Sequence, residues 1–321
     1  MHSFKELTEI FEEKFNIRHF PTEPASLYNS SQYILSLGGK RIRPVMCLMG
    51  NDLFNEINPE TYYVATAIEL FHNFTLIHDD IMDKAPLRRG LQTVHTKFGD
   101  STALISGDVM LVAAYEYLNK IKKHYLREVI SIFNKMAIEV CEGQQLDMDF
   151  EQKETVSFEE YLNMITLKTS ISLAASLKLG ALLGGAGLGN QNHIFQFGKN
   201  LGIAFQLQDD YLDAFGNPKK FGKQAGGDIL ANKKTFLLIH ALEVATKSQR
   251  AELKNLLKTN PDDKINKVLQ IFRDCNVDDW AQTLKEKYLQ KAFYHLEEIA
   301  VVSERKKPLK ELAEYLIERE N

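Results

Sequence analysis

Apolar residues recur at three- and four-residue spacing through most of this chain, which is the period of an α-helix rather than of a strand. The pattern predicts helices over residues 4–15, 24–37, 45–54, 60–83, 102–118, 125–149, 158–178, 191–215 and 233–246. Sustained alternation of polar and apolar residues is missing, and no Asn-Gly or Asp-Gly pair marks a hairpin. The charged region after about residue 245 also reads as helical and contains no candidate site. We therefore predict an all-α fold in which residues 1–321 form a single domain.

Composition narrows the class of protein. The 321 residues are 44% hydrophobic and 26% charged, which suits a soluble globular protein with a sizeable core. A net charge of −4 gives no support for nucleic-acid binding. The run 171–189 contains Lys178 and several glycines, so it predicts a buried helix ending in a glycine-rich turn, not a membrane span. Three widely spaced cysteines indicate no disulfide framework and favour a reducing, cytoplasmic location.

One predicted helix ends in three carboxylates, Asp79, Asp80 and Asp83. On a helix, Asp79 and Asp83 lie on one face, one turn apart. Pro86 disfavours helical geometry at the residue before it, so the carboxylates fall in the last turns. The helix dipole is negative there and makes each aspartate unfavourable by up to about 1 kcal/mol. Such a helix end needs cations to balance it, and this predicts a metal ion.

A second helix ends in the same way, at Asp209, Asp210 and Asp213, before Gly216-Asn217-Pro218. Two other aspartate pairs serve as internal controls, Asp262-Asp263 and Asp278-Asp279. Both controls come just before helical patterns, where aspartate can cap free N–H groups and suits the dipole. The controls therefore need no function, whereas the two clusters at helix C-termini lack that explanation.

Basic residues accompany both clusters and also occupy a loop after two glycines. They are Lys40, Arg41 and Arg43 in the loop, Arg88 and Arg89 after the first cluster, and Lys219, Lys220, Lys223, Lys233 and Lys234 after the second. Oxygen ligands without His or Cys at metal spacing suit Mg²⁺, and arginine and lysine suit phosphates. No nucleotide-binding glycine loop of either common type occurs. These residues predict a helical protein that binds phosphorylated ligands through Mg²⁺.

An ordered set of motifs between about residues 36 and 240 resembles the trans-polyprenyl diphosphate synthase family, of the short-chain type that makes farnesyl and geranylgeranyl diphosphate. Each motif is weak alone, but the ordered set is highly specific. It consists of Gly38-Gly39-Lys40-Arg41-Ile42-Arg43-Pro44, His72, Asp79-Asp80-Ile81-Met82-Asp83, Arg88-Arg89-Gly90, Gly107-Asp108, Gly143-Gln144 with Asp147, Lys168-Thr169, Gln206 with Asp209-Asp210-Tyr211-Leu212-Asp213, Gly222-Lys223 and Asn232-Lys233.

The resemblance implies the isoprenoid-synthase fold, a bundle of long helices around a central cavity, in a homodimer. It implies a head-to-tail prenyltransferase that joins isopentenyl diphosphate to dimethylallyl, geranyl or farnesyl diphosphate and releases pyrophosphate. The family's metal ligands, which hold three Mg²⁺ ions, correspond to Asp79, Asp83 and Asp209, with Asp80, Asp210 and Asp213 next. Its contacts to the allylic substrate correspond to Arg88, Lys168, Thr169, Gln206, Lys223 and Lys233, and those to isopentenyl diphosphate to Lys40, Arg43, His72 and Arg89.

The reaction implied by the resemblance is ionisation of the allylic C–O bond, attack by the isopentenyl double bond and loss of a proton to the released pyrophosphate. The residues expected to drive catalysis are Asp79, Asp80, Asp83, Lys168, Asp209 and Lys223. Gln144 and Asp147 are expected to support them, and His78 to be structural. A class I terpene cyclase would lack the basic glycine loop and the second cluster, and a head-to-head condensing enzyme is excluded on similar grounds. A non-catalytic regulatory subunit would have damaged clusters.

Product length is expected to depend on residues below the first cluster. In the family, bulky side chains there close the cavity that receives the growing tail. The candidates are Phe71, Phe74 and Thr75, at the eighth, fifth and fourth positions before Asp79. The aromatic at the fifth position with a small fourth residue resembles enzymes that make C20 products, with C15 next. On an ideal helix Thr75 faces the cavity better than Phe74 does, so either side chain can form the floor.

Overall fold

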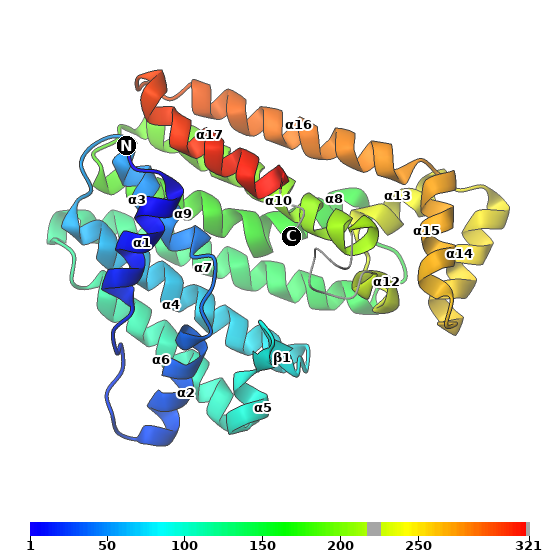
Figure 1. Ribbon diagram of the computed structural model, residues 1–321, viewed down its shortest axis with the longest axis horizontal. Helices are drawn as coiled ribbons and strands as arrows, with labels where there is room; N and C mark the ends of the chain where they lie inside the picture. The colour runs from blue at the N-terminus through cyan, green and yellow to red at the C-terminus, as the bar shows by residue number, and fades with distance from the viewer. Residues whose placement is uncertain (217–225, 319–321) are drawn as a thin grey trace. The chain divides into compact units, whose positions relative to one another are not determined.

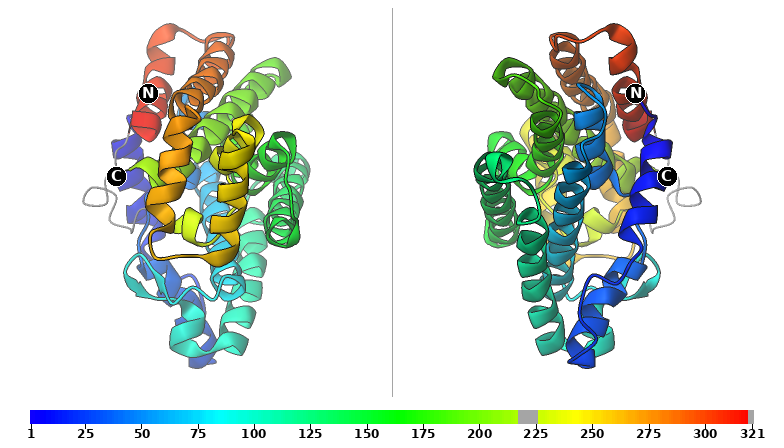
Figure 2. Two further views of the ribbon diagram at one scale, coloured as in Figure 1. Left: turned by 90° about the vertical axis from the view of Figure 1, so that its right-hand side faces the viewer. Right: turned by 90° about the vertical axis from the view of Figure 1, so that its left-hand side faces the viewer.

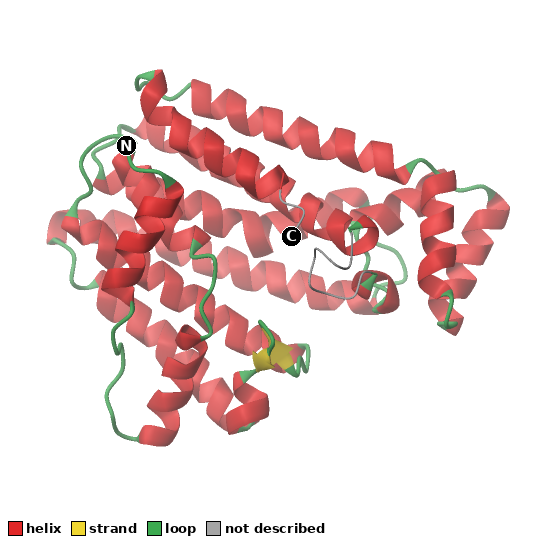
Figure 3. Ribbon diagram, in the orientation of Figure 1, coloured by secondary structure: helices red, strands yellow, loops and turns green. Residues whose placement is uncertain are grey.

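The computed structural model describes residues 1–216 and 226–318, and that part of the chain is almost entirely helical (Figure 3). Strands within it are confined to β1 (Leu87–Arg88) and β2 (Leu91–Gln92), which pair antiparallel. The prediction of an all-α fold is therefore confirmed. Among the described helices, none combines the length and the apolar composition that crossing a membrane requires.

The chain forms two compact units, whose helices are labelled in Figure 1. Unit 1 comprises Met1–Ala137 and Ala175–Asn192, and unit 2 comprises Ile138–Ala174 and His193–Asn321. The boundaries fall within three helices, α7 (Lys123–Gln152), α9 (Ile171–Leu183) and α10 (Leu188–Phe215). The first aspartate cluster belongs to unit 1 and the second to unit 2.

Unit 1 is built around α4, which carries the first cluster. Its helices are α1 (Phe4–Phe15), α2 (Ala25–Ser36), α3 (Ile42–Asp52), α4 (Pro59–Met82), α5 (Val94–Phe98) and α6 (Asp100–Leu118). The Asn58 side chain caps the start of α4 by accepting a hydrogen bond from Glu60, and Pro59 occupies its first turn. An almost continuous buried stretch from Val64 to Phe71 packs α4 against α3 and α6. The helix ends at Met82, as the proline-based prediction requires.

The hairpin of β1 and β2 is an element that the sequence pattern did not predict. Its two central residues, Arg89 (φ 54°) and Gly90 (φ 78°), both have positive φ, as in a type I′ turn. The usual sequence of that turn is Asn-Gly or Asp-Gly. Here the first position is Arg89, a residue that rarely has positive φ, so the sequence did not reveal the turn. The hairpin turns the chain back after the first cluster and brings Arg88 and Arg89 towards α4.

Unit 2 contains the remaining helices, among which α14 packs against α15 and α16 against α17 (Figure 2). They are α8 (Phe158–Ile165), a π-helical segment η1 (Thr166–Ser170), α10, α12 (Gly227–Leu230), α13 (Phe236–Val244), α14 (Lys247–Thr259), α15 (Lys264–Asp274), α16 (Val277–Glu297) and α17 (Ser303–Glu318). The helix predicted over 158–178 is therefore one helical run interrupted by a π turn. The helix predicted over 233–246 begins at Phe236, three residues later than predicted.

The control aspartate pairs lie at helix N-termini as predicted, but the predicted capping is wrong in detail. Asp263 occupies the N-cap of α15 without a side-chain capping bond, and its carboxylate instead pairs with Lys267 at 2.8 Å. Asp278 and Asp279 lie inside the first turn of α16, whose N-cap is Asn276. Their charge still suits the positive end of the dipole, so the contrast with the two C-terminal clusters holds.

Candidate active site

In the first cluster, the middle aspartate is held by the protein itself. Asp80 is 2% exposed, and Arg88 donates to both of its oxygens, Nε to Oδ2 at 2.8 Å and Nη2 to Oδ1 at 2.8 Å. Asp79 is partly exposed, with Oδ2 3.7 Å from Arg88 Nη2, and Asp83 is exposed at the C-cap of α4. A bidentate pair with arginine fixes Asp80 in position. The outer two carboxylates, one turn apart, face the surface of unit 1.

Next to this cluster, unit 1 gathers basic residues around His72. Arg43 Nη1 lies 3.3 Å from His72 Nε2, so the neutral imidazole accepts a hydrogen bond there. Burial, followed by the charges of Arg43 and Arg89, holds the pKa of His72 well below its usual value. The Arg89 guanidinium lies so close to Gly39 that a Cβ atom at that position would come within 2.8 Å of it. The predicted isopentenyl diphosphate residues Arg43, His72 and Arg89 are thus brought together.

A buried ion pair anchors the glycine loop that carries these cations. Arg41 is 4% exposed, has a left-handed backbone (φ 49°) and pairs through Nη1 with Glu69. Its Nη2 donates to the Leu35 carbonyl at 3.2 Å, and Asn73 donates to Glu69 Oε1 at 3.1 Å. The sequence presented Arg41 as one of three equivalent loop cations. The structure instead makes it the residue that fixes the backbone between Lys40, which is exposed, and Arg43.

In the second cluster, the middle aspartate is again buried but has uncharged partners. Asp210 is 5% exposed and accepts hydrogen bonds from Tyr161 Oη at 2.7 Å and Gln206 Nε2 at 2.8 Å. Burial, reinforced by the charge of Asp228, raises the pKa of Asp210 to about 7. Sequence reasoning missed Tyr161, which lies seven positions before Lys168 and belongs to no motif that the sequence displays. Asp209 and Asp213 are both partly exposed.

The π turn places Lys168 and Thr169. A Cβ atom on Gly143 of α7 would come within 2.2 Å of the Lys168 backbone nitrogen, so only glycine permits this approach. Lys168 Nζ pairs with Asp147 Oδ2 at 2.6 Å, and Thr169 Oγ1 donates to Gln206 Oε1 at 3.2 Å. Burial acts to raise the pKa of Asp147, but the charges of Lys233 and Lys168 outweigh it and the pKa is lowered. Single π turns inside helices are frequent at functional sites.

The remaining predicted residues of unit 2 lie on the segment after α10. The backbone N–H of Asp228 donates to Asp213 Oδ2 at 2.9 Å, which ties this segment to the second cluster. Lys233 follows the short helix α12, and its charge acts on both Asp147 and Asp210. Lys223 and the Gly222-Lys223 motif lie outside the described residues. Gln144 is partly buried on α7, one turn before Asp147.

The product-length candidates occupy two faces of α4. Phe71 is buried and packs edge-to-face on Phe133, with ring centroids 5.5 Å apart. Phe74 contacts Phe71 and also His78, whose centroid lies 4.8 Å away. Thr75 Oγ1 donates to the His72 carbonyl at 2.7 Å and lies one turn before Asp79. His78 contacts the Leu104 carbonyl at 3.1 Å and fills the space above Gly107, which agrees with the structural role predicted for it.

The carboxylates fit a hard divalent cation in a particular way. Among the described residues, no three His, Cys, Asp or Glu side chains converge closely enough to enclose a metal ion. Magnesium does not need such a cage, because it is usually held by one or two carboxylates together with waters and substrate phosphates. In each cluster the middle aspartate is bound within the protein, while Asp79, Asp83 and Asp209 present carboxylate oxygens at a partly exposed helix end. The donor set therefore suits Mg²⁺ bound together with a diphosphate.

An all-helical chain with two aspartate-ended helices, each accompanied by lysine or arginine, defines a class of prenyl-transferring proteins. Residues 24–274 match the family model described as polyprenyl synthetase, and the chain belongs to this family. It is therefore a trans-prenyltransferase of isoprenoid biosynthesis.

Individual relatives agree with this family. The chain is 35% identical over 306 residues to a geranylgeranyl diphosphate synthase of Methanosarcina mazei, covering 93% of this chain and 91% of that protein. It is 40% identical over 250 residues to a short chain isoprenyl diphosphate synthase of Methanocaldococcus jannaschii, covering 77% and 76%. A crystal structure of a geranylgeranyl pyrophosphate synthase superposes with a TM-score of 0.94 at 41% identity, over 100% of both chains. The isoprenoid-synthase fold is thereby confirmed, and neither a terpene cyclase nor a regulatory subunit is favoured.

Proposed function

We propose that the protein is a Mg²⁺-dependent head-to-tail prenyltransferase, which condenses isopentenyl diphosphate with an allylic diphosphate to make a short-chain, all-trans prenyl diphosphate. The observation that carries the proposal is the shared arrangement of the two clusters. In each, the middle aspartate is held by protein donors and the outer carboxylates are exposed in part. The similarity along nearly the full chain to synthases supports our further proposal that residues 1–321 act as one synthase domain.

The residues of unit 1 divide between the two diphosphates in this proposal. Arg43, Arg89 and neutral His72 form a basic group suited to the diphosphate of the isopentenyl substrate, with Lys40 beside them on the anchored loop. Asp79 and Asp83 would hold Mg²⁺ for the allylic diphosphate. Bound Mg²⁺ would neutralise the charge that develops on the departing pyrophosphate.

Unit 2 supplies the lysines that bind the same leaving group. Lys168 and Lys233 both act on Asp147, and Lys233 also acts on Asp210 of the second cluster, so this unit holds two cations close to its carboxylates. As the allylic C–O bond breaks, the departing pyrophosphate gains one negative charge over the diphosphate ester, so fixed positive charge favours it more strongly and lowers the barrier. The isopentenyl double bond then attacks the allylic cation, and the proton leaves to pyrophosphate. No side chain is assigned as a general base.

We further propose geranylgeranyl diphosphate as the preferred product, with farnesyl diphosphate next. Phe74 and Phe71 form an aromatic layer below the first cluster, and Thr75 occupies the face of Asp79. Two of the similar proteins are named as geranylgeranyl synthases, which supports a C20 product. The aromatic rings are expected to limit the space for the growing chain.

A homodimer is also part of the proposal. Helix α6 of unit 1 exposes a set of large apolar side chains along its length. They are Leu104, Ile105 and Val112, each at least half exposed. An unpartnered apolar stripe of this kind suits a second copy of the same chain. Sedimentation of the purified protein should give twice the chain mass.

The enzymatic proposal is tested by product analysis. Purified protein with Mg²⁺ and isopentenyl diphosphate is given dimethylallyl, geranyl or farnesyl diphosphate in separate reactions, and the products are resolved by chromatography. We expect pyrophosphate release with at least one allylic substrate and a C20 main product, both abolished by EDTA. Folded protein that releases no pyrophosphate from any of the three pairs would refute the proposal. A C15 or C25 main product would refute only the preferred length.

A further inference from the structure

Unit 2 buries a lysine that no part of the proposed reaction uses. Lys264, the first residue of α15, is 0% exposed. Its ammonium group donates to the Asn232 side-chain oxygen at 2.6 Å, the Asn260 side-chain oxygen at 3.0 Å and the Leu230 carbonyl at 3.3 Å. An ammonium has three N–H donors, and these three acceptors use all of them. Each of these acceptors is uncharged.

Burying an ammonium group among neutral acceptors is costly, because water solvates the charge better. Burial accordingly lowers the pKa of Lys264. An apolar side chain would fill such a position at lower cost. The positions of the bonded partners show what the charge achieves: two of the three, Leu230 at the end of α12 and Asn232 two residues later, form the turn that leads to Lys233.

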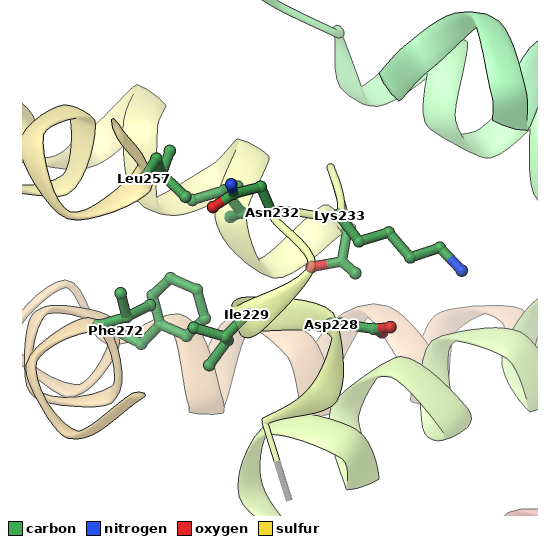
Figure 4. Close-up of a pocket in the computed structure, with 9 residues that line it drawn as sticks. Asp228, Ile229, Asn232, Lys233, Leu257 and Phe272 are labelled. Atoms are coloured by element: carbon green, nitrogen blue, oxygen red, sulfur yellow. The ribbon is translucent and has the colours of Figure 1, made fainter. Parts of the chain in front are cut away.

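Two charged residues that act on the second cluster flank that turn, Asp228 in α12 and Lys233 directly after the turn. Asn232 has a left-handed backbone (φ 57°), and the next residue, Lys233, donates its N–H to the Asp228 carbonyl at 2.9 Å. Figure 4 shows Lys233 and Asp228 extending to one side of the turn, away from Leu257 and Phe272 of the small pocket behind it. The Asp228 N–H is tied to Asp213, so the turn is fixed to the cluster at one end and to Lys264 at the other.

We propose that Lys264 is a positioning residue for the allylic diphosphate: its buried ammonium fixes the turn 230–232 so that Lys233 projects beside the second aspartate cluster. This inference rests on the proposed binding of that diphosphate by Lys233. Without the ammonium, the Asn232 side chain loses its partner, and the turn has alternative conformations in which Lys233 points elsewhere. The affinity for the allylic substrate then falls, while binding of isopentenyl diphosphate is unaffected.

Steady-state kinetics of Lys264→Met tests this, because methionine keeps the length of the side chain and removes the donors. We expect KM for the allylic diphosphate to rise about five- to tenfold, as for the loss of one charge-assisted contact, with KM for isopentenyl diphosphate unchanged. In a Lys233→Met background, the same Lys264→Met change should add nothing to the allylic KM. A purely structural role would raise both KM values or act equally in the two backgrounds, and either result would overturn the inference.

A matched pair of variants keeps the test decisive if Lys264→Met does not fold. Asn232→Gly and Asn260→Gly each remove one amide acceptor of the same ammonium and tolerate the positive φ of these positions (57° and 47°). Only Asn232 belongs to the turn before Lys233, so only Asn232→Gly should raise the allylic KM. Equal effects of the two would refute the positioning role.

The outcomes also separate this inference from the proposed function. A Lys233→Met variant with an unchanged allylic KM would refute the binding role of Lys233, and with it the inference. A raised allylic KM in Lys233→Met but not in Lys264→Met would refute the inference alone.

Discussion

The two aspartate clusters have the same spacing and the same position at helix C-termini, but the protein stabilises them differently. In unit 1 the buried middle aspartate, Asp80, has a charged partner, Arg88, which arrives from a hairpin eight residues along the chain. In unit 2 the buried middle aspartate, Asp210, has two uncharged partners, Tyr161 and Gln206. An arginine neutralises the carboxylate, whereas a phenol and an amide only solvate it. In the first cluster the charge of Asp80 is therefore neutralised by Arg88. In the second cluster Asp210 has no such partner among the described residues, and its pKa is raised.

Removal of an outer carboxylate should have the largest effect and should be similar in both clusters. We expect Asp79→Ala and Asp209→Ala each to lower kcat by at least about 10²–10³-fold, because each removes a ligand for the cation that stabilises the leaving group. Circular dichroism should stay that of a helical protein. Asp262→Ala, in an exposed control pair, should keep full turnover. Retained activity in Asp79→Ala or Asp209→Ala would refute the metal role of that residue.

The partners of the middle aspartates should differ in their contribution to stability. Arg88→Met leaves a buried carboxylate without its cation and should lower the free energy of unfolding by about 2–4 kcal/mol, allowing for the partial exposure of Arg88. Tyr161→Phe removes one of two neutral donors to Asp210 and should cost about 1–2 kcal/mol. Urea unfolding at pH 7 measures both. Equal losses, or a larger loss in Tyr161→Phe, would contradict the contrast between charged and uncharged partners.

The pH dependence of stability should expose the same contrast in metal-free protein. The pKa of Asp210 is about 7 in the folded chain, above the ordinary value of 3.8. The folded state therefore binds more protons, so the contribution of Asp210 to stability is present below about pH 4 and is lost as the pH rises through 7. Asp210→Asn should gain stability relative to wild type across this window, by up to about 1.4 kcal/mol per pH unit.

Urea unfolding in EDTA at pH 5 and pH 8 measures this gain. Asp80→Asn is the matched control in the first cluster. It should destabilise the protein at both pH values, since it removes the carboxylate that pairs with Arg88. If the stability that Asp210→Asn gains over wild type were the same at pH 5 and pH 8, the prediction would be contradicted.

The smallest effect on rate is expected for substitutions in α4 that change the length of the product. We assign this control of product length to α4 alone. Phe74→Ala should lengthen the product by one or more C5 units, because it opens space in the aromatic layer below Asp79. Thr75→Phe should shorten it if the floor lies on the face of Asp79 instead. Chromatography of the products distinguishes the two, with Phe158→Ala as a control for loss of a partly buried ring in unit 2. Unchanged length in both variants would place the floor elsewhere.

Much of the site was predictable because its residues follow local rules. The proline after the first cluster and the glycine after the second fixed where both helices end, so the placement of the aspartates was confirmed. The hairpin at Arg89-Gly90 was missed because an arginine occupies a position with positive φ (54°) that propensity assigns to other residues. The π turn at Lys168 was missed because hydrophobic periodicity does not mark it, and the residue that packs against its backbone, Gly143, is far away in the sequence.

The sequence by itself determined the helices, through their hydrophobic period, and the excess of negative charge at two helix ends, through the position of each aspartate. Tertiary structure decided which charges have partners within the protein. Arg88 with Asp80, Tyr161 with Asp210 and Lys264 with Asn232 join residues 8, 49 and 32 positions apart. A side chain's partner depends on the elements packed around it, and periodicity carries no information on that packing. For this reason the sequence did not single out Tyr161 and Lys264, and it did not distinguish the anchoring role of Arg41 from that of the other loop cations.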